Sequence, residues 1–163
     1  MSAISGLFPD QDENTLYLSR ADVNELLGTF SRHGFFLDGK EWPSVEHYYQ
    51  AMKFESESVQ EKIRSATHPK QARRLGRSRM RKLRKDWRKV KVVMMTRAVY
   101  TKCKAHPEVA QVLLATGDQK LLENSMYDYF WGCGRDRLAN NEYGKVLMRV
   151  RAKLKEESSK EED

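Results

Sequence analysis

The sequence predicts a single compact domain that is mainly α-helical and carries one small β-hairpin. A length of 163 residues suits one domain with one core. Capping residues followed by apolar residues at intervals of three and four recur from residue 44 to about residue 155, which indicates a series of helices. The clearest β signal is Asp38-Gly39 between bulky flanks, because Asp-Gly supplies the positive φ angles of a two-residue turn.

Along the chain, residues 1–14 are predicted to form a loose acidic leader and Thr15–Leu18 a short strand, whereas 22–30 favours no element. Ser44 is expected to cap a helix that runs to about Phe54. Further helices are predicted from Ser58, which has capping-box spacing to Glu61, from Thr67 to about Arg77, from Asp86 to about Lys104, from Pro107 to Thr116 and from Asn141 to about Lys155. Residues 120–130 favour an irregular segment. The domain is therefore expected to span 15–155, followed by a disordered charged tail at 156–163.

The composition argues against several classes of protein. The longest apolar stretch, 90–100, is interrupted by Lys91 and Arg97, so we expect no membrane span. The first ten residues lack a charged start followed by an apolar run, so no secretory signal is expected. Cys103 and Cys133 are too few for a disulfide framework, which favours a reduced, cytoplasmic location.

Positive charge is concentrated in one segment. Between residues 62 and 104 there are seventeen Lys or Arg and one acid, Asp86, whereas the rest of the chain has thirteen basic and twenty-two acidic residues. Such a segment attracts phosphates, on a small nucleotide or along a nucleic-acid backbone. The plainer interpretation is a solvated helix face, and the sequence leaves both open.

The helix predicted after Ser44 carries a chemically capable face. Glu46, Gln50 and Lys53 are spaced i, i+4 and i+7, with Tyr49 beside them. A carboxylate there can stabilise an oxocarbenium-like transition state or position water, and a Lys amine can attack an anomeric carbon to give a Schiff base. The alternative is an exposed helix face with a weak Glu–Lys pair.

A second candidate site is the glycine-bracketed loop 128–134. Its Trp131 offers a flat stacking surface, and Asp128 could hydrogen-bond ribose hydroxyls. Trp87, inside the basic segment, could stack on a base in the same way. Each Trp could equally be a core residue.

Neither a metal nor an organic cofactor is expected. The four histidines show no ligand spacing, and the chain has neither a Walker loop nor a GxGxxG motif. Cys133 could be a nucleophile, but no nearby residue is a natural base for it.

The ordered set of motifs from about residue 30 to residue 154 resembles the YbiA-like (NADAR) family. The matching residues are Asp38-Gly39-Lys40, Trp42-Pro43-Ser44, Glu46 to Ala51, Lys53-Phe54, Ala72 to Arg77, Leu83-Arg84, Trp87, Val90-Lys91, Leu113 to Thr116, Asp128, Trp131-Gly132, Gly134, Asn141, Gly144, Leu147-Met148 and Arg151. Each motif is weak alone, whereas their order is specific.

The resemblance implies a mostly helical N-glycosidase without metal or redox cofactor. Members cleave ribosylamino-pyrimidine phosphates early in the riboflavin pathway, or remove ADP-ribose from guanine, so the expected partners are a nucleotide-like small molecule or ADP-ribosylated DNA. By position, the implied catalytic residues are Glu46 and Lys53. The expected substrate-binding residues are Tyr49, Gln50, Trp87, Asp128, Trp131 and Asn141, with substrate phosphate held by Arg73, Arg74 and Arg77.

Two positions depart from the family pattern. Arg32 stands where an Asn near the substrate is usual, and Glu142 stands where a basic residue is common. Arg32 is therefore a further expected substrate contact, and it puts the identity of the sugar or phosphate in question. The rival hypothesis is a nucleic-acid-binding module without catalysis that uses the basic segment 62–104.

Overall fold

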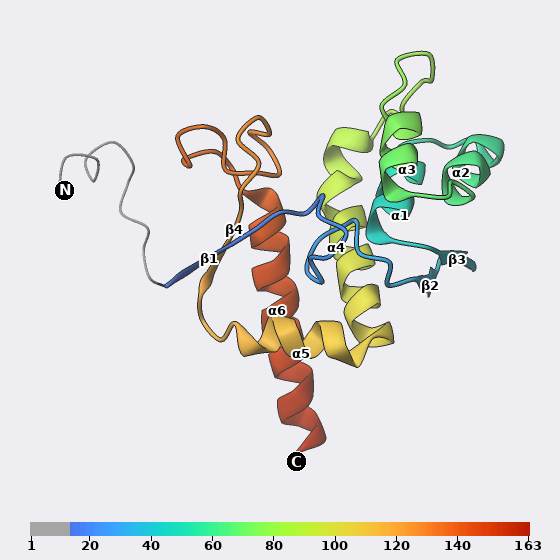
Figure 1. Cartoon of the computed structure of the whole chain (residues 1–163). Coiled ribbons are helices and arrows are strands. Elements are labelled where there is room, and N and C mark those ends of the chain that lie inside the picture. The colour runs from blue at the N-terminus through green and yellow to red at the C-terminus, as the bar shows by residue number, and fades with distance from the viewer. Residues whose placement is uncertain (1–13) are drawn as a thin grey trace.

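In the computed structural model, which describes residues 14–163, helices dominate and the strands are short (Figure 1). The helices are α1 (Val45–Ala51), α2 (Glu57–Arg64), α3 (Pro69–Gly76), α4 (Trp87–Ala105), α5 (Pro107–Ala115) and α6 (Glu142–Glu161). The strands are β1 (Thr15–Leu18), β2 (Phe35–Leu37), β3 (Lys40–Trp42) and β4 (Lys120–Glu123). The predicted fold class, mainly helical with a hairpin, is confirmed. Of the predicted leader, residues 1–13 lie outside the described residues.

A capping side chain starts α1, α2 and α3, whereas α4, α5 and α6 begin without one. Ser44 accepts a hydrogen bond from the amide of His47 and starts α1. The cap of α2 is Ser56, which accepts from the amide of Val59, so the predicted cap at Ser58 is wrong by two residues. Asp86 precedes α4 without capping it, because its carboxylate is bound by Arg84 at 2.6 Å.

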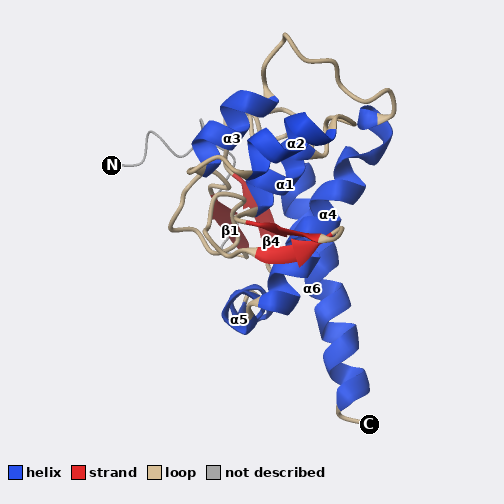
Figure 2. Cartoon of the chain, turned by 90° about the vertical axis from the view of Figure 1, so that its right-hand side faces the viewer, coloured by secondary structure: helices blue, strands red, loops and turns tan. Residues whose placement is uncertain are grey.

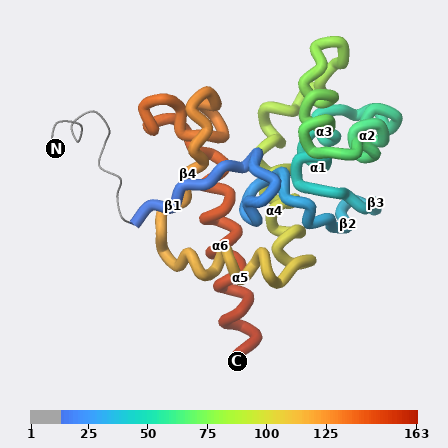
Figure 3. Tube along the Cα trace, viewed as in Figure 1, coloured from blue at the N-terminus to red at the C-terminus, as the bar shows by residue number. Residues whose placement is uncertain are grey.

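The β structure has one local part and one long-range part. The predicted hairpin forms, with β2 antiparallel to β3 and both Asp38 and Gly39 at positive φ. In addition, β1 pairs in parallel with β4, Thr15 opposite Lys120, so the segment 120–130 is not irregular throughout as predicted. The first and last thirds of the chain are therefore joined side by side (Figure 3).

Helix α4 lies at the centre of the helical arrangement. It contacts α1 on one side and α5 and α6 on the other, while α2 and α3 pack against α1 (Figure 2). Buried apolar residues from all these elements form one core, in which Tyr48, Ile63, Leu113 and Val146 are fully enclosed. Since α1 is buried along its whole length, its polar residues must find partners inside the protein.

The last helix is longer than expected. It continues to Glu161, so most of the segment 156–163, predicted to be a disordered charged tail, is helical. Within residues 14–163, no helix combines the length and apolarity that crossing a bilayer requires.

Candidate active site

A small inner cavity of about 70 Å³ lies where five parts of the chain meet. Helix α1 and the turn after it contribute four residues, α3 and its C-terminal residue two, and α4 one, and the segments that follow β1 and β4 supply the remainder. The lining residues are Arg20, Glu46, Tyr49, Gln50, Lys53, Arg73, Arg77, Met95, Asp128 and Trp131. The structure thus brings together Glu46, Lys53, Asp128 and Trp131, which the sequence placed in separate motifs.

Parallel pairing of β1 with β4 explains how distant residues reach this cavity. Both strands run in the same direction, so the segments that follow them leave from the same edge. Arg20 follows β1 and Asp128 follows β4, and Arg20 Nη2 donates to Asp128 Oδ2 at 2.5 Å. The backbone N–H of Arg20 also donates to Glu123 Oε1 at 3.1 Å, which holds the segment after β1 against the end of β4.

Glu46 is a buried carboxylate, 2% exposed, with both oxygens occupied. Oε1 accepts from Arg73 Nε at 2.9 Å and from Gln50 Nε2 at 2.8 Å, and Oε2 accepts from Thr29 Oγ1 at 2.7 Å and from Arg73 Nη2 at 3.5 Å. Burial acts to raise the pKa of Glu46, but the charge of Arg73 and these hydrogen bonds outweigh it and hold the pKa below its usual value. Glu46 is therefore a fixed anion rather than a proton donor.

Lys53 presents an amine to the same cavity. It lies in the turn after α1, and among residues 14–163 it makes no ion pair; its Nζ lies 5.5 Å from the centre of the Tyr49 ring. Desolvation lowers the pKa of Lys53 to about 8, helped by the charges of Arg77 and Arg73 and opposed by Glu46. About a tenth of this amine is therefore neutral at pH 7, far more than for an ordinary lysine, and the neutral form is the one that a nucleophile requires.

An aromatic wall closes the cavity. The indole Nε1 of Trp131 donates to the hydroxyl of Tyr49 at 3.0 Å, and the two rings meet edge to face. Trp87 packs on the other side of Tyr49, with ring centroids 5.2 Å apart, and lines neither this cavity nor the larger one beside it. Trp131 can therefore face a ligand directly, whereas Trp87 supports the wall from the core.

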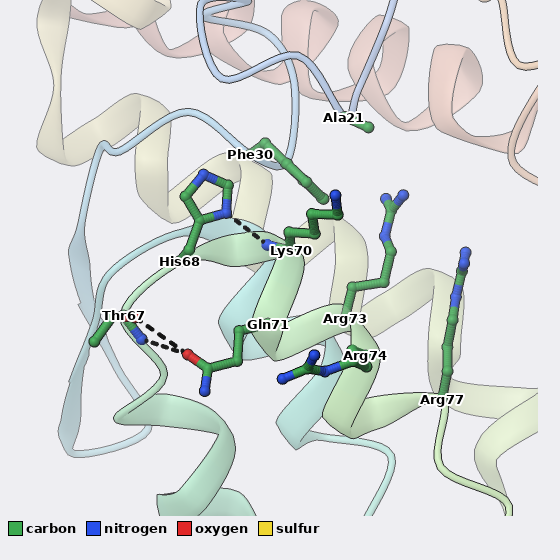
Figure 4. Close-up of a pocket in the computed structure, with 9 residues that line it drawn as sticks. All are labelled: Ala21, Phe30, Thr67, His68, Lys70, Gln71, Arg73, Arg74 and Arg77. Carbon is green, nitrogen blue, oxygen red and sulfur yellow. Dashed lines mark hydrogen bonds between the residues drawn. The ribbon is translucent and has the colours of Figure 1, made fainter.

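A larger outer cavity of about 1100 Å³ opens beside the inner one and shares Arg73 and Arg77 with it. Its other cationic lining residues are Lys70 and Arg74, both on α3. No carboxylate is among its lining residues. Figure 4 shows Lys70, Arg73 and Arg77 extending toward Ala21, while Arg74 turns toward Gln71. This surface suits an anionic group.

Two other predicted contact residues lie away from both cavities. Arg32 is exposed and lines neither of them. Asn141 is buried and joins β4 to α6: its Nδ2 donates to the carbonyl of Leu121 at 2.9 Å, and its Oδ1 accepts from the amide of Glu123 at 2.8 Å. Asn141 thus positions the segment that carries Asp128. Residues 14–163 contain no group of three or more His, Cys, Asp or Glu side chains that could hold a metal ion.

Three residues of the site's support were not predicted from sequence. Arg20 and Thr29 lie in or near the segment that favoured no element, and Glu123 lies in a strand that was not predicted. Thr29 depends on Arg20, since its amide donates to the carbonyl of Arg20 at 2.8 Å, while its hydroxyl donates to Glu46. Nothing in their local sequence distinguishes them from ordinary loop residues. Their place beside the cavity becomes visible only once β1 is paired with β4.

Comparison with known proteins shows the family. The NADAR domain model matches residues 7–155. N-glycosidase YbiA of Escherichia coli is 38% identical over 144 residues, which is 88% of this chain and 90% of that protein. An N-glycosidase of Nostoc punctiforme is 43% identical over 129 residues, 77% of this chain and 83% of that one.

Two further matches extend the comparison to structure and to larger proteins. The NMR structure of E. coli YbiA superposes with a TM-score of 0.79 at 37% identity, covering 88% of this chain and 86% of that one. A riboflavin biosynthesis protein of Vibrio vulnificus is 41% identical over 145 residues, which is 88% of this chain but 40% of that protein.

Proposed function

Because the chain belongs to the NADAR family and is a hydrolase of N-glycosyl bonds, we propose that the inner cavity is its active site, with Glu46 and Lys53 as the catalytic pair. The observation that carries this proposal is the juxtaposition of a saturated, ionised carboxylate and an amine of lowered pKa in one cavity. Catalytic sites typically bring together groups whose pKa values are shifted, such as an acid that stays ionised and an amine that becomes neutral.

Glu46 stabilises positive charge on the sugar. As the bond from the anomeric carbon to nitrogen breaks, charge develops on that carbon and the ring oxygen. A carboxylate already held by Arg73, Gln50 and Thr29 needs little reorganisation to meet this charge. Fixed charge of this kind can lower a barrier by several kcal/mol, about 3–4 for a single well-placed group.

Lys53 attacks the anomeric carbon in its neutral form. A bond forms from Nζ to this carbon and the bond to the base nitrogen breaks, and the leaving nitrogen takes up the proton that the attacking amine gives up. Opening of the sugar ring gives a protonated Schiff base, which water hydrolyses to release the sugar and restore the amine. The lowered pKa of Lys53 supports this covalent route over a purely binding role.

The cations around the site hold substrate phosphate. The inner cavity is lined by four cationic side chains, Arg20, Lys53, Arg73 and Arg77, against two carboxylates. Arg73 is already bound to Glu46, so it links the phosphate side to the carboxylate, whereas Arg77 makes no ion pair within residues 14–163. Arg77, with Arg74 and Lys70 in the outer cavity, is therefore the main phosphate ligand.

The substrate is a ribosyl N-glycoside that carries phosphate. A ribosylamino-pyrimidine phosphate is the first choice, and the relatives named as riboflavin biosynthesis proteins, from Vibrio vulnificus and Zea mays, support it. The second choice is ADP-ribosylated guanine, including guanine in DNA. The outer cavity favours it, since about 1100 Å³ of cation-lined space exceeds the need of a single phosphate.

The structure weakens the rival of a non-catalytic nucleic-acid-binding module. Several charges of the basic segment 62–104 have partners within the protein and are not free to bind a nucleic-acid backbone. Arg73 binds Glu46, Arg84 binds Asp86, Arg97 binds Asp38 and the buried Lys102 donates to backbone carbonyls. A surface built only for nucleic acid would leave such charges free.

The testing experiment is product analysis by liquid chromatography and mass spectrometry. The purified chain is incubated separately with a ribosylamino-pyrimidine phosphate and with an ADP-ribosylated guanine oligonucleotide. Released base or restored guanine is expected from the wild type, and loss of at least about a thousandfold in Glu46→Gln. Glu57→Gln, an exposed carboxylate on α2, is the matched control and should keep full activity.

Borohydride trapping tests the covalent route. A stable adduct on the wild type that is absent from Lys53→Met supports Schiff-base formation, and Lys62→Met on the exposed face of α2 should trap as the wild type does. Turnover of neither substrate, together with salt-sensitive DNA binding that survives Glu46→Gln, would favour the binding-module hypothesis instead.

A further inference from the structure

Arg20 carries a hydrogen-bond donor that the protein itself does not use. Its side chain is 7% exposed, and its Nη2 is bound to Asp128. Its Nη1 is buried and has no partner among residues 14–163. Arg20 lines the inner cavity, so an unpaired, charged N–H group lies at the wall of the site proposed for catalysis.

A buried donor without an acceptor is unfavourable, so its retention in a cavity points to a ligand atom that completes it. The other unpaired buried atom of a cavity residue, Gln50 Oε1, does not compete for this role. It faces Gly76, where an added Cβ would lie only 2.1 Å from it, so this oxygen is packed against α3. Among the buried side-chain atoms of the cavity residues, Arg20 Nη1 is thus the donor without a partner within residues 14–163.

Asp128 supplies a matching acceptor. Its Oδ1 accepts from the amides of Phe130 and Trp131, at 3.0 and 2.8 Å, and is fully occupied. Its Oδ2 accepts only from Arg20, which leaves one acceptor direction on that oxygen. A free N–H next to a free carboxylate lone pair fits a hydroxyl group, because a hydroxyl both accepts and donates.

The position of this donor–acceptor pair indicates which hydroxyl it binds. Arg20 and Glu46 line the same small cavity, and they are linked through Thr29, which donates to Glu46 and is held by the carbonyl of Arg20. A group bound by Arg20 therefore lies beside the carbon that Glu46 faces. On a furanose, the neighbour of the anomeric carbon bears the 2′-hydroxyl.

We propose that Arg20 is a substrate-binding residue that, with Asp128, holds the sugar 2′-hydroxyl and makes the enzyme select ribosides over 2′-deoxyribosides. This inference rests on the proposed placement of the reacting sugar in the inner cavity. The pairing of Arg20 with Asp128 offsets its charge, so it does not oppose the positive charge developing nearby. Hydrogen bonds to this hydroxyl strengthen as the oxocarbenium character grows, so selection appears in kcat as well as in binding.

The test asks whether changing Arg20 or Asp128 alters the preference of the enzyme for a substrate with a 2′-hydroxyl. The ratio of kcat/KM for a ribosylamino-pyrimidine phosphate over its 2′-deoxy analogue is measured for wild type, Arg20→Lys and Asp128→Asn. The ratio is expected to be about 100 in the wild type, as for one hydrogen bond to a charged group, and to fall below about 10 in Arg20→Lys. Arg64→Lys, an exposed pair with Glu61 on α2, should keep the wild-type ratio.

The ratio is insensitive to folding, because a partly unfolded preparation lowers both rates equally. A wild-type ratio near one, or equal loss of both rates in Arg20→Lys with the ratio unchanged, overturns the assignment and leaves Arg20 a structural residue.

A second measurement separates this inference from the proposed function. Binding of ribose 5-phosphate and 2-deoxyribose 5-phosphate is measured by calorimetry, which requires no turnover. Preference for the ribose compound in the wild type but not in Arg20→Lys supports the inference even if neither N-glycoside is hydrolysed, in which case only the proposed reaction fails. Equal binding of the two sugar phosphates, or binding of neither, overturns it.

Discussion

The inner cavity, where we propose the active site, has two walls of different construction. The wall of α1 places Glu46, Tyr49, Gln50 and Lys53 within eight consecutive residues. The other wall, the strand wall, joins Arg20 to Asp128 through the parallel pairing of β1 with β4. These two residues are 108 positions apart in the sequence. Each wall carries one ionised carboxylate, but their hydrogen bonding differs.

This difference separates charge stabilisation from ligand binding. Both oxygens of Glu46 are occupied by three side chains of the protein, so this carboxylate is held in place as a charge. Asp128 keeps an acceptor direction free and lies beside an unpaired donor of Arg20. A saturated carboxylate suits a developing cation, whereas an unsaturated one suits a hydroxyl.

The largest effect is expected from Glu46→Gln, which removes the charge of the α1 wall and keeps its shape. The amide cannot stabilise positive charge on the sugar, so kcat should fall about a thousandfold, or about 4 kcal/mol. Steady-state kinetics measures the loss, and thermal unfolding checks that the fold persists. A loss in KM alone would mean that Glu46 only binds substrate.

Next in size is the disruption of the strand wall by Gly144→Ala. Gly144 lies in the first turn of α6, and an added Cβ would stand 2.1 Å from the carbonyl oxygen of Leu121 in β4. The carbonyl of Leu121 is backbone, and the Asn141 side chain, 2.4 Å from the added Cβ, is held by hydrogen bonds to β4, so little room is left to adjust. The free energy of unfolding should therefore fall by about 3 kcal/mol, despite the better helix propensity of Ala. Denaturant titration measures the change. Unchanged stability would mean that β4 and α6 can separate without harm.

The two walls also differ in how well the sequence predicts them. Ser44, the Asp38-Gly39 turn and the spacing of Glu46, Gln50 and Lys53 are local signals, and the hairpin and α1 form as they indicate. The alternative of an exposed helix face is wrong for α1, however, because all of its residues are buried under α2, α3 and α4. Local periodicity cannot predict how many neighbours a helix has.

The strand wall was only half predicted, for a physical reason. A four-residue strand that pairs with a partner about a hundred residues away has no local signature, so β4, Arg20 and Thr29 were missed. Trp87 illustrates a related limit. A Trp that stacks on Tyr49 in the core and one that stacks on a ligand look alike in sequence, and only the packing separates Trp87 from Trp131.

A smaller effect is expected from Gly76→Ala, which disturbs the α1 wall without touching a charged group. An added Cβ would lie 2.1 Å from Gln50 Oε1 and 2.7 Å from its Cβ, so Gln50 must move and release Glu46 Oε1. We expect loss of about 1–2 kcal/mol of stability and a fall in kcat of about 30-fold. Kinetics and thermal unfolding together measure it. Full activity would show that Gln50 does not need to hold Glu46.

The smallest expected effect is the pH dependence of the amine on the α1 wall. Lys53 attacks only when neutral, and its pKa is about 8, so kcat/KM should rise about tenfold from about pH 7 to about pH 9 and then level off. Arg77→Gln removes a neighbouring positive charge that lowers the pKa of Lys53, so the rise should move to higher pH.

Lys102 provides the control for this profile. Burial lowers its pKa to about 8 as well, but its Nζ donates to the carbonyls of Leu26 and Gly28, outside the cavity. Lys102→Met should therefore lower the amount of folded enzyme without moving the rise in kcat/KM. A rise that moves with Lys102→Met but not with Arg77→Gln would assign the titration to the support of the strand wall, because Lys102 holds the segment that carries Thr29.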